Sequence, residues 1–113
     1  MTRDILLVDD ELNTLKVISA ALTGNRFNVE TARSGEEALE AIARRHFDLV
    51  MTDYRLPGMN GEQVLDKIKT LHPEMPVIIL TAYGSIASAV NAMRKGAYTY
   101  LTKPVNLELL DSV

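Results

Sequence analysis

The stretch from Leu49 to Gly61, LVMTDYRLPGMNG, decides how the rest of the chain is interpreted. Its apolar start over residues 49–51 is typical of a buried strand, and Asp53 stands where that strand should end. Pro57 and Gly58 then occupy the second and third positions of a predicted type II turn. A carboxylate at the mouth of a buried strand either solvates the loop or takes part in chemistry. The rest of the chain has to decide between these two interpretations.

Segments with strand and helix patterns alternate along the whole sequence. The predicted strands are residues 5–8, 28–32, 49–52, 77–80 and 98–101. Amphipathic helices are predicted to begin near residues 12, 35, 61 and 86, and a last one after Asn106. Ser34 and Glu37 have the spacing of a capping box at the start of the second helix. This alternation predicts an α/β fold, a doubly wound parallel sheet with helices on both faces.

Each predicted helix has an apolar face that should lie against the sheet. The inward residues are expected to be Leu12, Leu15, Ile18 or Ser19, and Leu22, then Ala38, Leu39, Ile42 and Ala43, then Val64, Leu65, Ile68 and Leu71, and finally Ile86, Ala89, Val90 and Met93. The weakly charged outward face of the fourth helix, expected to carry Ala87, Ser88, Asn91, Ala92 and Lys95, is either plain surface or a partner-docking face. The last helix has only about eight residues, which is short for a helix. We therefore expect a single domain over residues 1–113, excised from a longer chain, with its last helix truncated.

Composition excludes several classes of protein. A chain of 113 residues with 47% hydrophobic and 24% charged residues has the make-up of one ordinary soluble domain. The absence of cysteine excludes disulfides and thiolate metal sites. A net charge of −3 without a basic stripe argues against direct nucleic-acid binding. No apolar run is long enough for a membrane span and no signal peptide is present, so a cytoplasmic domain without membrane contact is expected.

The strand ends carry the residues with chemistry. In a parallel sheet all carboxyl ends lie at one edge, where ligands bind. The first strand is followed by Asp9 and Asp10, the third by Asp53, the fourth by Thr81 and the fifth by Lys103. Topology alone should therefore bring three carboxylates, a hydroxyl and an ammonium group together.

This set of groups favours metal-assisted phosphoryl transfer. Clustered carboxylates repel unless they bind a hard cation, and an all-oxygen site favours Mg²⁺ or Mn²⁺. One carboxylate remains to attack a phosphoryl group, while the metal and Lys103 neutralise the transferred charge. Thr81 and nearby backbone N–H groups would hold the remaining phosphoryl oxygens.

The acidic pair Asp9–Asp10, the stretch LVMTDYRLPGMNG and the motifs LTAYGS and YLTKP occur in an order and spacing that resemble a known family. Over its whole length the chain resembles the receiver domain of bacterial two-component response regulators. The resemblance implies a flavodoxin/CheY-like fold of five parallel strands in the order 2-1-3-4-5. It also implies that Asp53 is the phosphoacceptor and that a sensor histidine kinase supplies the phosphoryl group.

The resemblance assigns a role to each matching residue. Asp10, Asp53 and the backbone carbonyl of Arg55 would bind Mg²⁺ (or Mn²⁺), and Asp9 would act through water. The remaining assignments are Lys103 to contact the phosphoryl group, Thr81 and Tyr100 as the switch pair, and Ala82 as the small residue that leaves the site reachable.

Within the family, the segment TAYGSIASAVNAMRKGAYTYLTKPV most resembles receivers of enhancer-binding (NtrC-type) transcription activators. This implies a C-terminal output domain and a possible homodimer through the face of the fourth helix, fifth strand and last helix. Two alternatives stay open. The first is an unphosphorylated protein-interaction module on the same fold. The second is a Mg²⁺-dependent aspartyl-phosphate phosphohydrolase, which would normally carry a carboxylate where this chain has Arg55.

Overall fold

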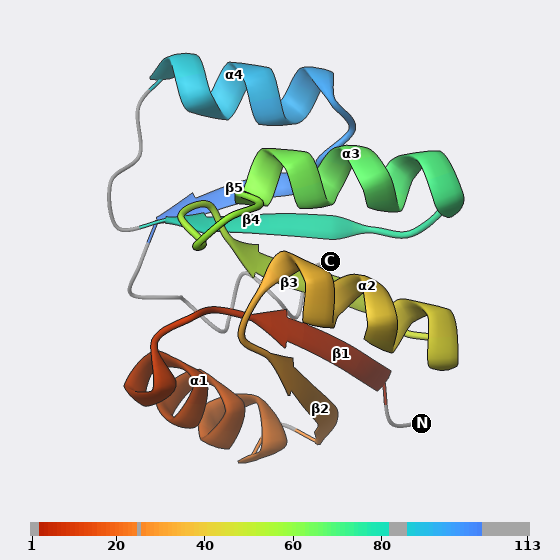
Figure 1. Ribbon diagram of the computed structural model, residues 1–113. Helices are drawn as coiled ribbons and strands as arrows, with labels where there is room; N and C mark the ends of the chain where they lie inside the picture. The colour runs from red at the N-terminus through yellow and green to blue at the C-terminus, as the bar shows by residue number, and fades with distance from the viewer. Residues whose placement is uncertain (1–2, 25, 82–85, 103–113) are drawn as a thin grey trace.

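A computed structural model describes residues 3–24, 26–81 and 86–102 of the chain (Figure 1). Strands and helices alternate throughout this part. The strands are β1 (Arg3–Val8), β2 (Phe27–Ala32), β3 (Leu49–Asp53), β4 (Val77–Thr81) and β5 (Thr99–Thr102). The helices are α1 (Leu12–Gly24), α2 (Gly35–Arg44), α3 (Gly61–Leu71) and α4 (Ile86–Arg94). The first four predicted strands and the first four predicted helices are confirmed, with bounds shifted by one or two residues. The predicted last helix lies outside the described residues.

All strand pairs in the sheet are parallel, and the order is β2-β1-β3-β4-β5. The chain starts near the middle of the sheet, moves to the β2 edge, and then returns past β1 to β3 and β4. The predicted doubly wound order 2-1-3-4 is therefore confirmed. Strand order reverses between β1 and β3, and Val8 pairs there with Thr52. The residues that follow these two partners are Asp9 and Asp53, so the reversal puts the two carboxylates side by side.

Two apolar clusters fix the sheet between its helices. On one face Ile5, Leu7, Met51 and Leu80 pack with residues of α1. On the other face Leu6, Val8, Val50 and Ile79 pack with residues of α2 and α3, and Ala92 of α4 belongs to the same cluster. Among the described helices, α1 is the one that lies on its side of the sheet in Figure 1. The residues of β1 from Ile5 to Val8 are all buried, as their unbroken aliphatic run predicts.

The starts of α2 and α3 are both capped by side chains. Ser34 accepts a hydrogen bond from the backbone N–H of Glu37, as predicted. The reciprocal half of that capping box is wrong, because the Glu37 carboxylate accepts from the N–H of Arg33, one residue further back. A complete capping box occurs instead at α3, between Asn60 and Gln63. No helix in the described ranges is long and apolar enough to cross a membrane.

Several residues predicted to face the core are exposed. Leu12 and Leu71, 49% and 64% exposed, are the first residue of α1 and the last residue of α3, where a helix extends past the sheet it covers. Ala43 is also exposed, and Ala41 is buried in its place.

Helix α4 shows the largest departure from the expected burial. Among residues 90–94, the part of α4 whose side chains are described, Ala92 is buried although it was expected to face outward, whereas Val90 and Met93 are 42% and 47% exposed. At 100° per residue, a helix with Ala92 inward turns both of these apolar side chains away from the core. A small alanine at the contact also lets the helix lie close to the sheet.

Gly61 allows α3 to begin directly against the end of β3. A Cβ atom at Gly61 would lie 2.6 Å from the carbonyl oxygen of Asp53 and 2.8 Å from the Cα of Tyr54. Both are backbone atoms, so neither can move aside cheaply. We expect Gly61→Ala to lower the free energy of unfolding by about 1–3 kcal/mol, as overpacking of a core does. Urea denaturation followed by circular dichroism measures this change.

The matched control is Gly24→Ala at the end of α1, where an added Cβ meets nothing within 4 Å. This change should leave stability unchanged or raise it by up to about 1 kcal/mol, since alanine restricts the unfolded chain more than glycine does. Equal unfolding free energies for the two variants would show that the contact at Gly61 is not tight.

Candidate functional site

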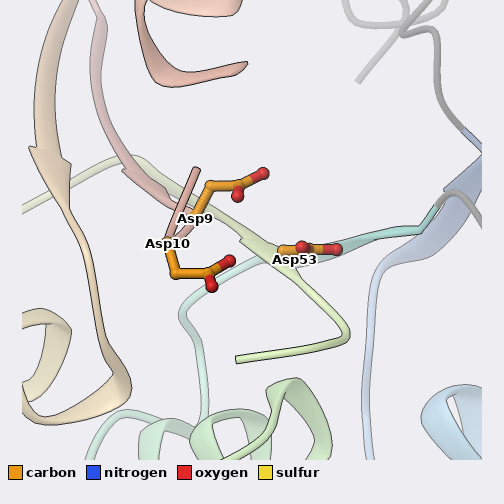
Figure 2. A group of neighbouring side chains, drawn as sticks. All are labelled: Asp9, Asp10 and Asp53. Carbon is orange, nitrogen blue, oxygen red and sulfur yellow. The ribbon is translucent and has the colours of Figure 1, made fainter. Parts of the chain in front are cut away.

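Three aspartates gather where β1 and β3 end (Figure 2). Asp9 and Asp10 directly follow β1, and Asp53 is the last residue of β3. Each side chain offers one carboxylate oxygen, and these oxygens all lie within 4.8 Å of one another. The prediction that topology alone brings the three carboxylates together is confirmed.

The three carboxylates differ in exposure. Asp9 is 1% exposed and Asp53 is 9% exposed, whereas Asp10 is open to solvent. The Oδ1 atom of Asp9 accepts a hydrogen bond from the backbone N–H of Glu11 at 2.9 Å. The N–H of Asp9 donates to the carbonyl of Ala32 at 3.0 Å, which continues the ladder with β2. Asp9 is thus fixed by its own loop, while the Asp10 side chain stands at the open side of the group.

Asp53 is held from both sides along the backbone. The hydroxyl of Thr52 donates to the carbonyl oxygen of Asp53 at 3.1 Å. The next residue, Tyr54, donates its N–H to the carbonyl of Leu80 in β4 and accepts from the N–H of Gly61, both at 2.8 Å. Gly58 has φ +73°, the value that the third position of the predicted type II turn requires. Strand, turn and helix start therefore fix the Asp53 backbone without using its carboxylate oxygens in these bonds.

Two cationic side chains belong to the rim of this edge. Arg33, in the loop between β2 and α2, donates from Nη2 to the backbone carbonyl of Asp10 at 3.3 Å. Arg55 is exposed and lies two residues after Asp53 in the chain. The sequence prediction included Arg55 for its backbone carbonyl and missed Arg33 altogether. The available signal was positional: Arg33 follows the end of β2, and β2 pairs with β1 immediately before Asp9 and Asp10.

The donor set fits a hard divalent cation. Three carboxylates within 4.8 Å supply only oxygen ligands and a large negative charge, two of them from largely buried side chains. Such a group suits Mg²⁺ or Mn²⁺ and lacks the nitrogen and sulfur ligands that zinc prefers. No other group of three or more histidine, cysteine, aspartate or glutamate side chains with this geometry occurs in the described part of the chain.

Among the remaining predicted site residues, the backbone places Thr81 at the same edge of the sheet. Thr81 ends β4 and pairs with Thr102, the last residue of β5. Tyr100 lies in β5 opposite Ile79. Lys103 and Ala82 lie outside the described residues, as do the side chains of Thr81 and Tyr100. Their predicted roles therefore stay predictions.

Comparison with known proteins gives a consistent result. Residues 5–113 match the family described as response regulator receiver domain. The chain is 44% identical over 109 residues to the transcriptional regulatory protein ZraR of Escherichia coli O157:H7, covering 96% of the chain and 25% of that protein. It is 45% identical over 106 residues to the transcriptional regulatory protein GlrR of Escherichia coli K12, covering 94% and 24%. The chain thus spans about a quarter of the length of these relatives.

Solved structures agree with the sequence relatives. A receiver domain protein from Clostridium thermocellum superposes with a TM-score of 0.91 at 38% identity, covering 97% of this chain and 89% of that one. NtrX from Brucella abortus superposes with a TM-score of 0.90 at 38% identity, covering 99% and 26%. The family match therefore identifies a class of signalling domain. The chain belongs to the response regulator receiver domain family, and its fold is the CheY-like flavodoxin fold.

The close approach of three carboxylates should cost stability when no cation is bound. Two unit charges 4.8 Å apart repel by about 1 kcal/mol in water. We expect Asp10→Asn to raise the free energy of unfolding by about 1 kcal/mol in EDTA, because it removes one of these charges. The stabilisation that the wild type gains from added Mg²⁺ should shrink in the same variant. Thermal denaturation with EDTA and with Mg²⁺ measures both effects.

The control is Glu40→Gln, which removes one negative charge from an exposed position of α2. It should keep the wild-type response to Mg²⁺. A wild-type melting temperature that does not change when Mg²⁺ is added would contradict the cation site.

Proposed function

We propose that this domain is a Mg²⁺-dependent phosphoacceptor switch in which Asp53 carries the phosphoryl group. The observation that carries the proposal is the grouping of Asp9, Asp10 and Asp53 within 4.8 Å in a chain of the receiver family. Asp53 is the member of the group that ends β3, the middle strand of the sheet, which supports its choice as the phosphoacceptor.

Each residue has a distinct part in the proposed reaction. Asp10 and Asp53, with the backbone carbonyl of Arg55, would hold the cation, and Asp9 would act through water. The bound cation supplies charge neutralisation for the transferred phosphoryl group. Lys103 would pair with that group, Thr81 would hydrogen-bond it, and Tyr100 would reorient with Thr81. The small Ala82 would keep the site open to the donor.

The transfer balances without any further reactant. A carboxylate oxygen of Asp53 forms a bond to phosphorus while the bond from phosphorus to the donor's leaving atom breaks. With a histidine kinase the leaving atom is an imidazole nitrogen, and with acetyl phosphate it is an acetate oxygen. The product is an acyl phosphate whose phosphoryl group carries about −1.5 to −2 charge units and three acceptor oxygens, in place of the single negative charge of the free carboxylate.

The wider assignments follow from the relatives. Those cited above are named as transcriptional regulatory proteins and are about four times as long as this chain. We therefore propose that the domain lies in the cytoplasm, receives phosphate from a sensor histidine kinase and controls a transcriptional output domain of the NtrC-like class. Phosphorylation would act by shifting an existing conformational equilibrium.

Asp53 phosphorylation can be tested by incubating the domain with acetyl phosphate and Mg²⁺ and measuring its intact mass. The wild type should gain the mass of one phosphoryl group. Asp53→Asn should gain none, because an amide cannot form the acyl phosphate, and EDTA should prevent the gain in the wild type. A wild type that stays unmodified with every donor tried would favour the interaction module instead. Continuous phosphate release from phosphomonoesters would favour the phosphohydrolase.

The exposed apolar side chains of α4 support the proposed homodimer. Val90 and Met93 are nearly half exposed on the same helix. A second copy of the chain in its phosphorylated form is the occupant that we propose for this surface. Met93→Lys should shift the phosphorylated domain toward monomer in sedimentation velocity, since a charge would have to be buried. Val17→Lys, at a 69% exposed position on α1, is the control and should leave association unchanged. Equal association of the two variants would place the dimer contact elsewhere.

A further inference from the structure

The side chain of Arg33 is hydrogen-bonded to the backbone of the acidic group. Its Nη2 atom donates to the carbonyl of Asp10 at 3.3 Å. Its backbone N–H donates to the Glu37 carboxylate at 2.8 Å, and Ser34 beside it caps α2. The loop that carries Arg33 is thus fixed both to its own helix and to the loop of Asp10, while the side chain stays exposed.

We propose that Arg33 sets the balance between cation affinity and donor affinity at this site. This hydrogen bond holds the guanidinium next to the backbone of Asp10, whose own carboxylate would bind the metal. A fixed positive charge there repels a divalent cation and attracts an anionic phosphoryl donor. Arginine remains charged at any working pH, so this contribution is permanent. The inference rests on the proposed phosphoacceptor function. It adds that Arg33 weakens the binding of the cation and strengthens the binding of the phosphoryl donor.

The chain surrounding Arg33 supports an electrostatic role over a purely structural one. The hydrogen bond to Asp10 is long and exposed, so its loss should disturb the fold little. The loop also keeps the Ser34 cap and the Arg33 backbone bond to Glu37 when the side chain is changed. Coulomb interactions at this range act on both charged reactants even through water, and salt screens them.

The test compares Arg33→Gln with wild type in two separate measurements. Mg²⁺ affinity is measured without any donor, from amide chemical shifts during a Mg²⁺ titration. Donor use is measured at saturating Mg²⁺, as the second-order rate constant for phosphorylation by acetyl phosphate. At low salt we expect Mg²⁺ to bind about two- to fivefold more tightly and the phosphorylation rate constant to fall by a similar factor. Both changes should diminish in about 0.5 M salt, where the Debye length is only a few ångströms.

Two control variants separate position from charge. Arg33→Lys keeps the charge and should restore both constants toward wild type. Arg44→Gln makes the same chemical change at the other end of α2, where Arg44 pairs with Glu30 at 3.2 Å, and should alter neither constant appreciably.

Each outcome of the comparison decides the inference. A variant that loses both Mg²⁺ affinity and phosphorylation rate would show that Arg33 acts by holding the loop, which overturns the proposal. Two unchanged constants would also overturn it. If the wild type binds Mg²⁺ but accepts no phosphate, the phosphoacceptor proposal fails. In that case the Mg²⁺ titration still tests whether Arg33 lowers the affinity for the cation. The claim that Arg33 raises the affinity for the donor then fails together with the phosphoacceptor function.

Discussion

Mutual repulsion among three carboxylates is the constraint on which the rest of this domain depends. Asp9, Asp10 and Asp53 approach within 4.8 Å, a placement that like charges resist. What holds them is the aliphatic sheet, since the residues before them in β1 and β3 are buried on both faces. Each buried Leu or Ile side chain contributes about 1.5–3 kcal/mol, so the core outweighs the repulsion many times over. The apolar strands thus supply the free energy that keeps a reactive site assembled.

Much of this arrangement could be predicted from the sequence because it follows from topology. Unbroken aliphatic runs identified the buried strands, and alternation with helices implied a parallel sheet. Since parallel strands share a carboxyl edge, Asp9, Asp10 and Asp53 had to meet there without any further information. The prediction required only the identity of the residues at the strand ends. These residues can be identified from the local sequence pattern alone.

The errors have a common physical origin in features that depend on more than one segment. Helical periodicity alone could not say that Ala92, and not Val90 or Met93, would contact the sheet, because the rotation of α4 is set by packing against other elements. The capping box predicted from Ser34 and Glu37 is a local exception, since Glu37 accepts from the N–H of Arg33, four residues before it, in place of the N–H of Ser34. Arg33 was likewise overlooked because its contact with Asp10 joins residues 23 positions apart. Long-range polar contacts leave no periodic trace in a sequence.

The described contacts also give a change at Asp53 a physical route to α4. Tyr54 follows Asp53 directly, and its hydroxyl donates to Glu62 of α3 at 3.1 Å. One turn further along α3, Asp66 accepts from Lys95, the residue after α4, at 2.8 Å. This hydrogen bond raises the pKa of Lys95 above its ordinary value, so Lys95 stays protonated and the link persists across the neutral range.

An ion pair between exposed side chains is weak. A conformational switch requires contacts weak enough to be broken. Asp66 and Lys95 are both about half exposed, and such pairs contribute little to stability. The start of α3 is held more closely, because the N–H of Gly61 donates to the carbonyl of Tyr54 at 2.8 Å and an added Cβ at Gly61 would lie 2.6 Å from the carbonyl oxygen of Asp53. The site end of this route is therefore rigid and the α4 end is loosely held. The α4 end is thus the least constrained part of this route, and α4 is the helix that carries the exposed Val90 and Met93.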